Sequence, residues 1–384
     1  MRIAMVGTRG IPTRLGGAER VVEQLARHLV LRGHEVLVYC RRGLVDENGN
    51  GNGNGSGGGL VRLFTPHWEG KHVESLTATA TAVWDLLRRG VDVVHVHSPG
   101  PAMLSWLPAA AGRAVVFTVH AADWRRDKWS PAARAAIRGG LWCGMKCAAQ
   151  VTAVSASLAA ELERQYHRPV RFVPNAAPAC EPVEVRMLPQ WRLTPGRYLL
   201  HVGRIVPEKR LDLLLRSWKQ AGGKAHGKPS VGIDPDGWKL VVAGQWDDSD
   251  YGRACRAAGG PDVLFLGPRH GRELAELYSH AGAVVQPSVL EGMSLVLLEA
   301  AAYGRCLLAA DIPANREVLG EAALYVQPDD AAALAGAIGR YMECQDDRDR
   351  LGEQARRRVA DLPTWAQVAQ TMERVYQAAR AEAP

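Results

Sequence analysis

Short apolar stretches alternate with amphipathic segments along almost the whole chain, and this alternation limits the possible folds more than any other feature. An apolar run of four to eight residues favours a buried strand, and a longer segment with apolar residues three or four apart favours a helix. Strands that alternate with helices form parallel sheets covered on both faces. The sequence therefore predicts an α/β fold with doubly wound sheets.

The alternation occurs in two series, which is expected because 384 residues are too many for one ordinary core. The first series contains predicted strands at 2–7, 34–40, 60–64, 91–97, 113–120, 149–155 and 170–175, and predicted helices at 18–32 and 73–89. The second series contains predicted strands at 198–203, 238–244, 263–267, 283–288, 306–311 and 323–327, and predicted helices at 210–220, 271–280 and 295–303.

A proline-rich segment without periodicity separates the two series and predicts an interdomain linker. The predicted domains are residues 1–178 and 196–360, and the last helix, 361–384, is a candidate to pack back on the first domain. Residues 48–59, rich in Asn and Gly, predict a flexible surface insertion. Two such domains would face a central cleft at the carboxyl edges of their sheets, where α/β folds bind ligands.

The composition indicates a globular protein that stays in the cytoplasm. Hydrophobic residues make up 47% and charged residues 23%, and no apolar run is long enough to span a bilayer. The start, "MRIAMVGTRG", becomes glycine-rich too early for a signal peptide. Seven scattered cysteines argue against a disulfide framework, and Cys143 and Cys147 have no evident partners for a metal.

The net charge of +7 would suit a nucleic acid, an anionic membrane surface or a phosphorylated small molecule. Aromatic residues are sparse, so a base-stacking platform for nucleic acid has little support. Solvated helix faces account for much of the remaining charge. The net charge alone does not indicate which of these partners the protein binds.

Gly16 and Gly17 immediately precede the first predicted helix, after the loop that follows the first strand. Glycines let a ligand approach the backbone, and the amides at a helix N-terminus favour a phosphate. The spacing does not match the dinucleotide fingerprint G-x-G-x-x-G. A phosphate-facing loop and an ordinary turn both remain open for these residues.

Arg204 and Lys209 lie between the first strand and first helix of the second series. Arginine offers a planar fork for phosphate oxygens and lysine a mobile point charge. Their position at the carboxyl end of a predicted strand favours a diphosphate clamp over ordinary surface charges.

Two acids lie eight positions apart in the otherwise apolar segment "SVLEGMSLVLLEAAAYG". Glu291 falls in a predicted loop, and Glu299 falls about one turn into the following helix. The amides of Gly292, Met293, Ser294 and Leu295 lie between them and predict an anion site. Because carboxylates can accept from neighbouring sugar hydroxyls, Glu299 could hold a ribose and Glu291 a second sugar beyond the phosphates.

The same segments resemble a known enzyme family. "SVLEGMSLVLLEAAAYG" resembles the E-x7-E segment of the retaining family 4 glycosyltransferases, and "HVGRIVPEK" resembles their G-R-x-x-x-x-K loop. "GTRGIPTRLGGAERVVEQLARHL", "VVHVHSPGPAMLSWLP" and "VFTVHAADWRRDKW" are similar to a bacterial rhamnosyltransferase-like subgroup. The resemblance covers nearly the whole chain outside the insertion.

The resemblance implies a GT-B fold, transfer with retention at the anomeric carbon, and no metal or other cofactor. It implies that Arg204 and Lys209 hold the diphosphate, that Glu299 holds the ribose, and that Glu291 with the amides of residues 292–295 holds the donor sugar and phosphate. His120 matches a histidine of the donor-sugar pocket, for which His95 and His97 compete. Gly16 and Gly17 match the phosphate-facing loop. Ala121 and Arg210 stand where the family commonly has glycine, which leaves the identity of the donor sugar open.

The sequence therefore predicts a cytoplasmic hexosyltransferase that moves a sugar from a nucleotide diphosphate to an acceptor hydroxyl. The expected pathway class is bacterial surface polysaccharide or glycoconjugate biosynthesis. Its expected partners are the nucleotide sugar and a saccharide or lipid-linked acceptor, with the inner membrane face as a candidate contact and no nucleic acid. Two alternatives remain, a sugar-nucleotide 2-epimerase of the same fold and a non-catalytic sugar-nucleotide-binding protein.

Overall fold

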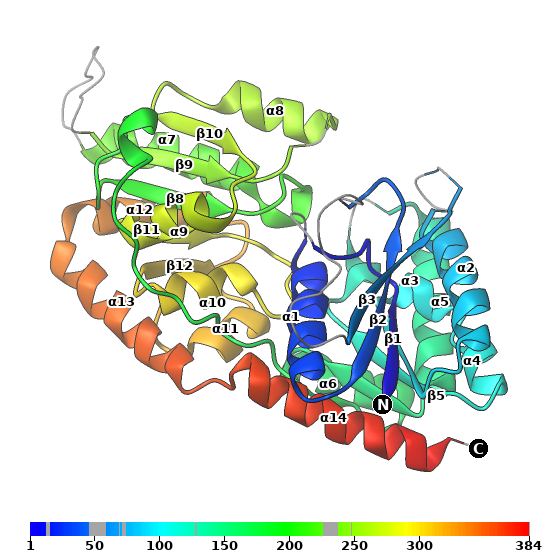
Figure 1. Ribbon diagram of the computed structural model, residues 1–384. Coiled ribbons are helices and arrows are strands. Elements are labelled where there is room, and N and C mark those ends of the chain that lie inside the picture. The colour runs from blue at the N-terminus through cyan, green and yellow to red at the C-terminus, as the bar shows by residue number, and fades with distance from the viewer. Residues whose placement is uncertain are drawn as a thin grey trace. The chain divides into compact units, whose positions relative to one another are not determined.

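The computed structural model describes residues 1–12, 16–45, 59–68, 70, 74–126, 129–225, 237–246 and 248–383. The chain forms two compact units, one of residues 1–176 with 363–384 and the other of residues 177–362. Of the predicted Asn/Gly insertion, only Gly59 lies within the described residues. The two units are drawn in Figure 1 and are described separately below.

The first unit contains a seven-stranded parallel sheet in the order β3-β2-β1-β4-β5-β6-β7. Most of its strands are continuous apolar runs, as expected for strands covered on both faces. The strands are β1 (Arg2–Val6), β2 (Glu35–Arg41), β3 (Leu60–Thr65), β4 (Val93–His97), β5 (Ala114–Val119), β6 (Gln150–Ala153) and β7 (Arg171–Phe172).

Helices cover both faces of this sheet. One face packs against α1 and α14 through a core that includes Leu25, Leu29, Met372 and Tyr376. The other face packs against α2, α3 and α5. The helical elements of this unit are α1 (Gly17–Leu31), α2 (Glu74–Arg88), α3 (Pro99–Ala102), α4 (Trp106–Ala110), η1 (Asp123–Arg125), α5 (Pro131–Cys147), α6 (Ala156–Tyr166) and α14 (Trp365–Glu382).

The last helix returns to the first unit. α14 begins with a capping box in which Thr364 and Gln367 satisfy each other's backbone amides. Its apolar side packs on α1, β4, β5 and β6 (Figure 1). The C-terminal segment therefore completes the core of the unit that contains the N-terminus.

The second unit contains a six-stranded parallel sheet in the order β10-β9-β8-β11-β12-β13. Its strands are β8 (Tyr198–Val202), β9 (Lys239–Ala243), β10 (Val263–Gly267), β11 (Ala283–Gln286), β12 (Cys306–Ala310) and β13 (Leu324–Val326). The prediction of two doubly wound, Rossmann-like parallel sheets is thus confirmed.

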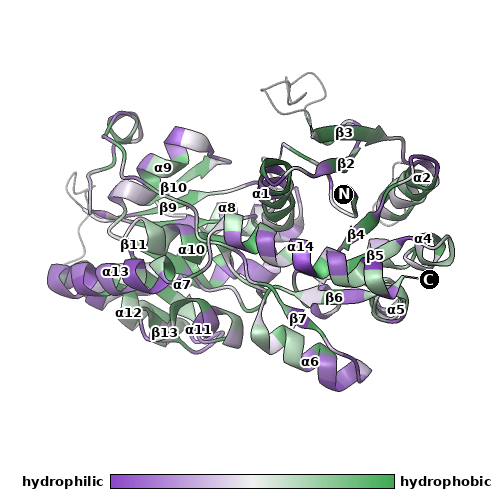
Figure 2. Cartoon of the chain, turned by 60° about the horizontal axis from the view of Figure 1, so that its bottom comes forward, coloured by the Kyte–Doolittle hydropathy of each residue, from purple (hydrophilic) through white to green (hydrophobic). Residues whose placement is uncertain are grey.

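Two hydrophobic clusters sandwich the second sheet. One joins it to α9, α10, α11 and α13, and the other joins it to α7, α8 and α12. In Figure 2 the strands are mostly green, the colour of apolar residues, whereas α13 and α14 show much of the purple of polar residues. The helical elements are η2 (Leu188–Trp191), η3 (Pro207–Lys209), α7 (Leu211–Ala225), α8 (Asp250–Ala258), α9 (Gly271–His280), α10 (Leu295–Ala302), α11 (Pro313–Leu319), α12 (Ala331–Glu343) and α13 (Gln345–Ala360).

The segment predicted as a linker is packed against the second unit. Leu188 and Leu193 are buried in its core. The carboxylate of Glu276 on α9 accepts hydrogen bonds from the backbone amides of Arg186, Met187 and Leu188 at 2.7, 2.7 and 2.9 Å. Burial would raise the pKa of Glu276, but these three amides hold it below its usual value.

Glu276→Gln should lower the free energy of unfolding by about 2–3 kcal/mol, because a neutral amide cannot accept three buried N–H groups equally well. Urea unfolding measures the change. Glu273→Gln on the same helix is the matched control, since that carboxylate makes only a 3.4 Å contact with Arg269. Equal stability of the two variants would contradict the assigned role of Glu276.

Candidate active site

The strand order of the second sheet reverses between the neighbouring strands β8 and β11. From β8 the chain continues to β9 and β10 toward one edge, and from β11 it continues to β12 and β13 toward the other edge. Such a switch point is where open α/β sheets bind ligands. The loops that follow β8 and β11 are joined there by a hydrogen bond from the amide of Val289 to the carbonyl of Glu208, at 3.1 Å. The predicted clamp and the two predicted acids follow these two adjacent strands.

Lys209 and Glu291 are in direct contact. The Nζ of Lys209 lies 2.5 Å from Oε1 of Glu291, and their side chains are 16% and 12% exposed. Gln286, the last residue of β11, donates to the same oxygen at 2.9 Å. Burial would raise the pKa of Glu291, but the charge of Lys209 and the hydrogen bonds hold it below its usual value. Glu291 is therefore a fixed carboxylate at neutral pH.

The N-terminus of α10 lies between the two acids in the sequence. Ser294 is its N-cap and accepts from the amide of Leu297. The first turn of α10 contains no acid, so the positive end of the helix dipole has no carboxylate of its own. Glu299 is one turn further along this helix and is 5% exposed. This arrangement suits an anion at the predicted amides of residues 292–295.

Arg204 follows β8 directly after Gly203 and is partly exposed. The backbone here is closely packed, because a Cβ on Gly244 would lie 1.7 Å from the carbonyl oxygen of Gly203. Gly203 also donates its amide to the carbonyl of Ala243 at 3.0 Å. The loop that carries Arg204 is thus held against the end of β9.

Arg210 occupies a left-handed conformation, with φ 54°. A residue with a Cβ is disfavoured there by about 1–2 kcal/mol, which gives a physical reason for glycine at this position in the family pattern. In this chain the guanidinium of Arg210 pairs with Asp329 and lies 3.7 Å from Asp212. These ion pairs stabilise arginine at this position.

In the first unit, His120 follows β5 and contacts a second histidine. Its Nε2 lies 2.9 Å from Nδ1 of His97, the last residue of β4. His95 is bound elsewhere, because its Nδ1 lies 2.8 Å from the hydroxyl of Tyr376 and its Nε2 lies 2.6 Å from Oγ1 of Thr118. His95 and His97 are buried and His120 is partly exposed. Exposure therefore favours His120 among the three as the residue that can meet a ligand.

Burial keeps these histidines neutral. It lowers the pKa of His95 to about 3 and of His120 to about 4, and it lowers the pKa of His97 well below the usual value. In the second unit, burial lowers the pKa of His201 to about 4, and the nearby charge of Lys209 adds to this shift. His120 can therefore act as a neutral hydrogen-bonding group throughout the physiological pH range.

We expect the free energy of unfolding to fall as the pH drops from about 6.5 to about 4. Below its usual pKa each of these histidines binds a proton in the unfolded chain but not in the folded protein, so acid favours unfolding. Each should remove about 1 kcal/mol per pH unit in this window.

Urea unfolding at about pH 7 and about pH 5 measures this difference. His201→Asn should reduce it, whereas His167→Asn should not, because His167 is exposed and its left-handed φ of 52° suits asparagine. A stability that does not change with pH would contradict the assigned protonation states.

Gly16 and Gly17 lie at the start of α1, as predicted, and Gly16 has a φ of 94° that favours glycine. A carboxylate already lies at this helix end. Glu19 accepts from the amide of Arg9 at 3.4 Å, and a Cβ on Gly16 would lie 2.2 Å from Oε2 of Glu19. A phosphate that bound at the N-terminus of α1 would have to displace Glu19. No such displacement is needed at α10, because the first turn of α10 contains no acid. The role of Gly16 and Gly17 stays a prediction.

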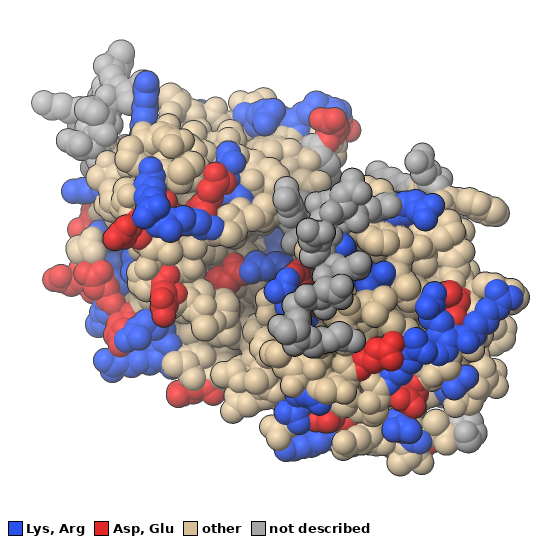
Figure 3. Space-filling view, viewed as in Figure 1, with Lys and Arg blue, Asp and Glu red and all other residues tan. Residues whose placement is uncertain are grey.

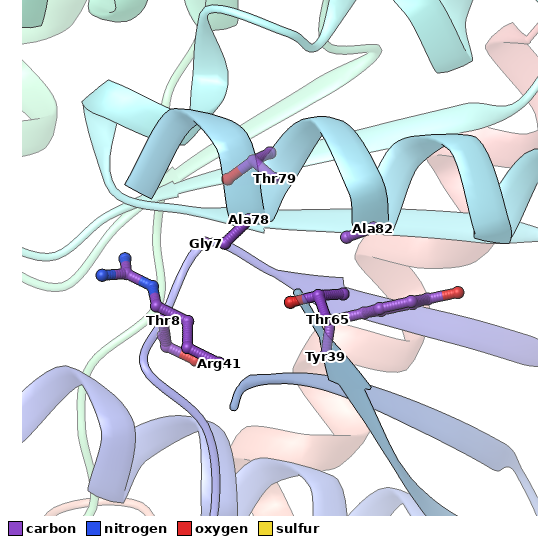
Figure 4. Close-up of a pocket in the computed structure, with 8 residues that line it drawn as sticks. All are labelled: Gly7, Thr8, Tyr39, Arg41, Thr65, Ala78, Thr79 and Ala82. Carbon is purple, nitrogen blue, oxygen red and sulfur yellow. The ribbon is translucent and has the colours of Figure 1, made fainter. Parts of the chain in front are cut away.

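A small hollow opens at the carboxyl edge of the first sheet, between the ends of β1 to β3 and α2 (Figure 4). Its cavity volume is only about 10 Å³, which is room for about one water molecule. None of the predicted site residues lines it. The lining residues are Gly7, Thr8, Tyr39, Arg41, Thr65, Ala78, Thr79 and Ala82.

Within the described ranges, no group of three or more His, Cys, Asp or Glu residues is arranged to hold a metal ion. Cys143 and Cys147 lie on α5 with their sulfurs 3.8 Å apart, and Cys143 donates to the carbonyl of Met103. The metal independence of the site stays a prediction. No helix in the described part of the chain combines the length and apolarity needed to cross a membrane.

Two residues that support the predicted ones, Gln286 and His201, were not predicted from the sequence, and a third, His97, was predicted only as a competitor of His120. Gln286 donates to Glu291, and Nδ1 of His97 lies 2.9 Å from Nε2 of His120. His201 is close enough to Lys209 for the charge of the lysine to lower its pKa. Each is a polar residue in an otherwise apolar predicted strand. This signal was present in the sequence, because a polar group in a buried strand needs a partner.

Two family models match the chain. The model for glycosyltransferase family 4 matches residues 15–178, and the model for glycosyl transferases group 1 matches residues 190–358. The chain also has the GT-B fold. A solved structure of Anabaena HepE in complex with UDP-glucose is similar over 98% of this chain and 99% of that one, with a TM-score of 0.77 at 16% identity.

Two relatives extend the comparison. A glycogen synthase of Mycobacterium tuberculosis is 26% identical over an alignment that covers 99% of this chain and 95% of that protein. An uncharacterized glycosyltransferase of Methanocaldococcus jannaschii is 28% identical over 48% of this chain, and this match spans only 45% of that protein. The chain belongs to the family 4 glycosyltransferases. Its assignment to a rhamnosyltransferase-like subgroup stays a prediction.

Proposed function

We propose that this chain transfers a sugar from a nucleotide diphosphate sugar to an acceptor hydroxyl, with retention at the anomeric carbon and without a metal. The observation that carries the proposal is the contact of Lys209 with Glu291 at the switch point of the second sheet. The acid-free N-terminus of α10 and the buried Glu299 follow in the sequence. The transferred sugar, the phosphates and the ribose of a nucleotide sugar could meet these groups in this order. The UDP-glucose complex of the structurally similar HepE supports a nucleotide sugar as donor.

The proposed roles follow from the charge that develops during transfer. As the bond from the anomeric carbon to the diphosphate oxygen breaks, the electron pair leaves with the diphosphate. The acceptor oxygen forms its bond to the anomeric carbon on the same face, and the proton of the acceptor hydroxyl passes to a diphosphate oxygen. Arg204, Lys209 and the amides of residues 292–295 stabilise the negative charge of the diphosphate. This electrostatic assistance performs the task that a metal ion performs in other transferases.

The remaining site residues hold the two sugars of the donor. Glu299 accepts hydrogen bonds from ribose hydroxyls, and Glu291 accepts from the transferred sugar, on which positive charge develops. His120, neutral and fixed by His97, lines the pocket of the transferred sugar. The first unit binds the acceptor, a saccharide that is free or linked to a lipid. A lipid-linked acceptor would bring this cytoplasmic protein to the inner face of the membrane.

The test is to incubate candidate nucleotide sugars with the protein, with and without saccharide acceptors, in the presence of a chelator. Transfer with an unchanged anomeric configuration in the product supports the proposal. Release of an epimerised sugar without acceptor would identify a 2-epimerase instead. Binding without turnover of any donor would identify a sugar-nucleotide sensor.

A further inference from the structure

Four tryptophans of the first unit are unusually exposed. Trp68, Trp84, Trp106 and Trp142 are 76%, 63%, 52% and 57% exposed. Trp84, Trp106 and Trp142 lie on α2, α4 and α5, and the amide of Trp68 donates to Oγ1 of Thr77 on α2. An indole ring loses favourable burial when it faces water, so several exposed rings on neighbouring helices indicate a contact surface.

The three helices form one continuous layer. α4 contacts both α2 and α5, and α3 also contacts both of these helices. This layer covers the face of the sheet opposite α1 and α14 (Figure 1). Exposed side chains on these helices therefore lie on the side of the layer away from the sheet. Trp84, Trp106 and Trp142 therefore lie on the helical layer that covers one face of the first sheet.

Along α2 the exposed side is apolar for most of its length. Leu76, Ala80 and Trp84 follow one another at four-residue spacing and are exposed. The next position in this row is Arg88, whose guanidinium carbon lies 4.0 Å from the centre of the Trp84 ring. The row ends in a cation stacked on an aromatic ring.

On α5 the exposed side combines small apolar and basic residues. Ala135, Arg138, Trp142 and Lys146 are exposed at spacings of three and four. The sequences of α4 and α5 contain no Asp or Glu. Basic side chains also lie near α2, with acidic side chains among them (Figure 3). We call the surface formed by Trp84, Trp106, Trp142, Arg88, Arg138 and Lys146 the tryptophan face.

We propose that the tryptophan face binds the surface of an anionic phospholipid bilayer. Tryptophan is favoured at the interface between lipid tails and headgroups, because its ring is apolar and its N–H can still reach water. Lysine and arginine beside it attract anionic headgroups, and the acid-free α4 and α5 add no repulsion. This inference adds a partner to the proposed function but rests on surface composition alone, independent of the donor site.

The test is sedimentation of the full chain with phosphatidylcholine vesicles that contain about 30% phosphatidylglycerol, and with pure phosphatidylcholine vesicles. We expect binding to the anionic vesicles that weakens as salt is raised. Replacing Trp84, Trp106 and Trp142 together with serine should weaken binding at least about tenfold. Each of Arg88→Gln, Arg138→Gln and Lys146→Gln should weaken it about fivefold at low salt.

Phe172→Ser is the matched control, because Phe172 is also an exposed aromatic residue of the first unit but lies on β7 at the edge of the sheet. It should leave vesicle binding unchanged. Every variant should keep the affinity of the wild-type chain for uridine or guanosine diphosphate, which separates a failed surface from a failed donor site.

Three results would overturn the proposal. The first is equal binding of the wild-type chain to neutral and anionic vesicles. The second is vesicle binding that survives the triple tryptophan variant. The third is a wild-type chain that binds no vesicles and is a dimer in light scattering, but becomes a monomer in that variant, which would make the tryptophan face a contact between two copies of the chain.

Discussion

Glu291→Gln should lower turnover by about 10²–10³-fold and leave the affinity for a nucleoside diphosphate unchanged or higher. Glutamine keeps the size of the side chain but removes the negative charge that would face the sugar ring in the transition state. The change also releases Lys209 from its 2.5 Å contact with this carboxylate, so that the lysine is freer to meet a diphosphate.

Initial rates with the full donor and calorimetry with the bare nucleotide measure the two effects. Glu273→Gln serves as the control, because that carboxylate is 37% exposed on α9 of the same unit. Near-normal turnover in Glu291→Gln would exclude this residue from the reaction. A large loss of nucleotide affinity would show that it holds the nucleotide rather than the transferred sugar.

Lys209→Met should also lower turnover by about 10²–10³-fold, because it removes the cation that we propose to contact the diphosphate, and such a contact would strengthen as the leaving group departs. This variant should be less stable than the wild-type chain at neutral pH, because Glu291 is left buried without its cation. Lys209 holds the pKa of Glu291 down, so the stabilisation is present above the unfolded pKa of about 4.3 and is lost in acid.

The double variant Lys209→Met with Glu291→Gln separates catalysis from stability. It contains no buried unpaired charge at this position, so its stability should recover toward that of the wild-type chain. The turnover of the double variant should be no higher than that of the less active single variant. A double variant that regained turnover would show that Lys209 serves only to neutralise Glu291.

Much of the fold could be predicted because buried parallel strands leave a local signal. The apolar runs at 2–7, 91–97 and 283–288 correspond to β1, β4 and β11, and the predicted helix 271–280 has the observed bounds of α9. The strand predicted at 170–175 is shortened to the two residues of β7, at the edge of the sheet. The apolar pattern of residues 170–175 does not reveal at which residue the hydrogen bonds to the neighbouring strand end.

Long-range contacts could not be predicted from local patterns. The proline-rich segment around Leu188 resembles a linker because its order depends on Glu276, almost ninety positions later. His95 meets Tyr376 on the last helix, 281 positions away. The candidate site residues could be proposed because they follow strand ends, but the direct pairing of Lys209 with Glu291 depends on two loops that only the sheet order brings together.

The central claim is that the two acids of the second unit hold different parts of one donor, and calorimetry on Glu299→Gln and Glu291→Gln tests it most directly. The titrants are uridine and guanosine diphosphate, which contain the ribose but not the transferred sugar. We predict that Glu299→Gln weakens binding of the preferred nucleotide by about tenfold or more, because it removes a charged acceptor from the ribose hydroxyls, and that Glu291→Gln does not weaken it. Unchanged nucleotide affinity in Glu299→Gln, together with a loss in Glu291→Gln, would contradict the account.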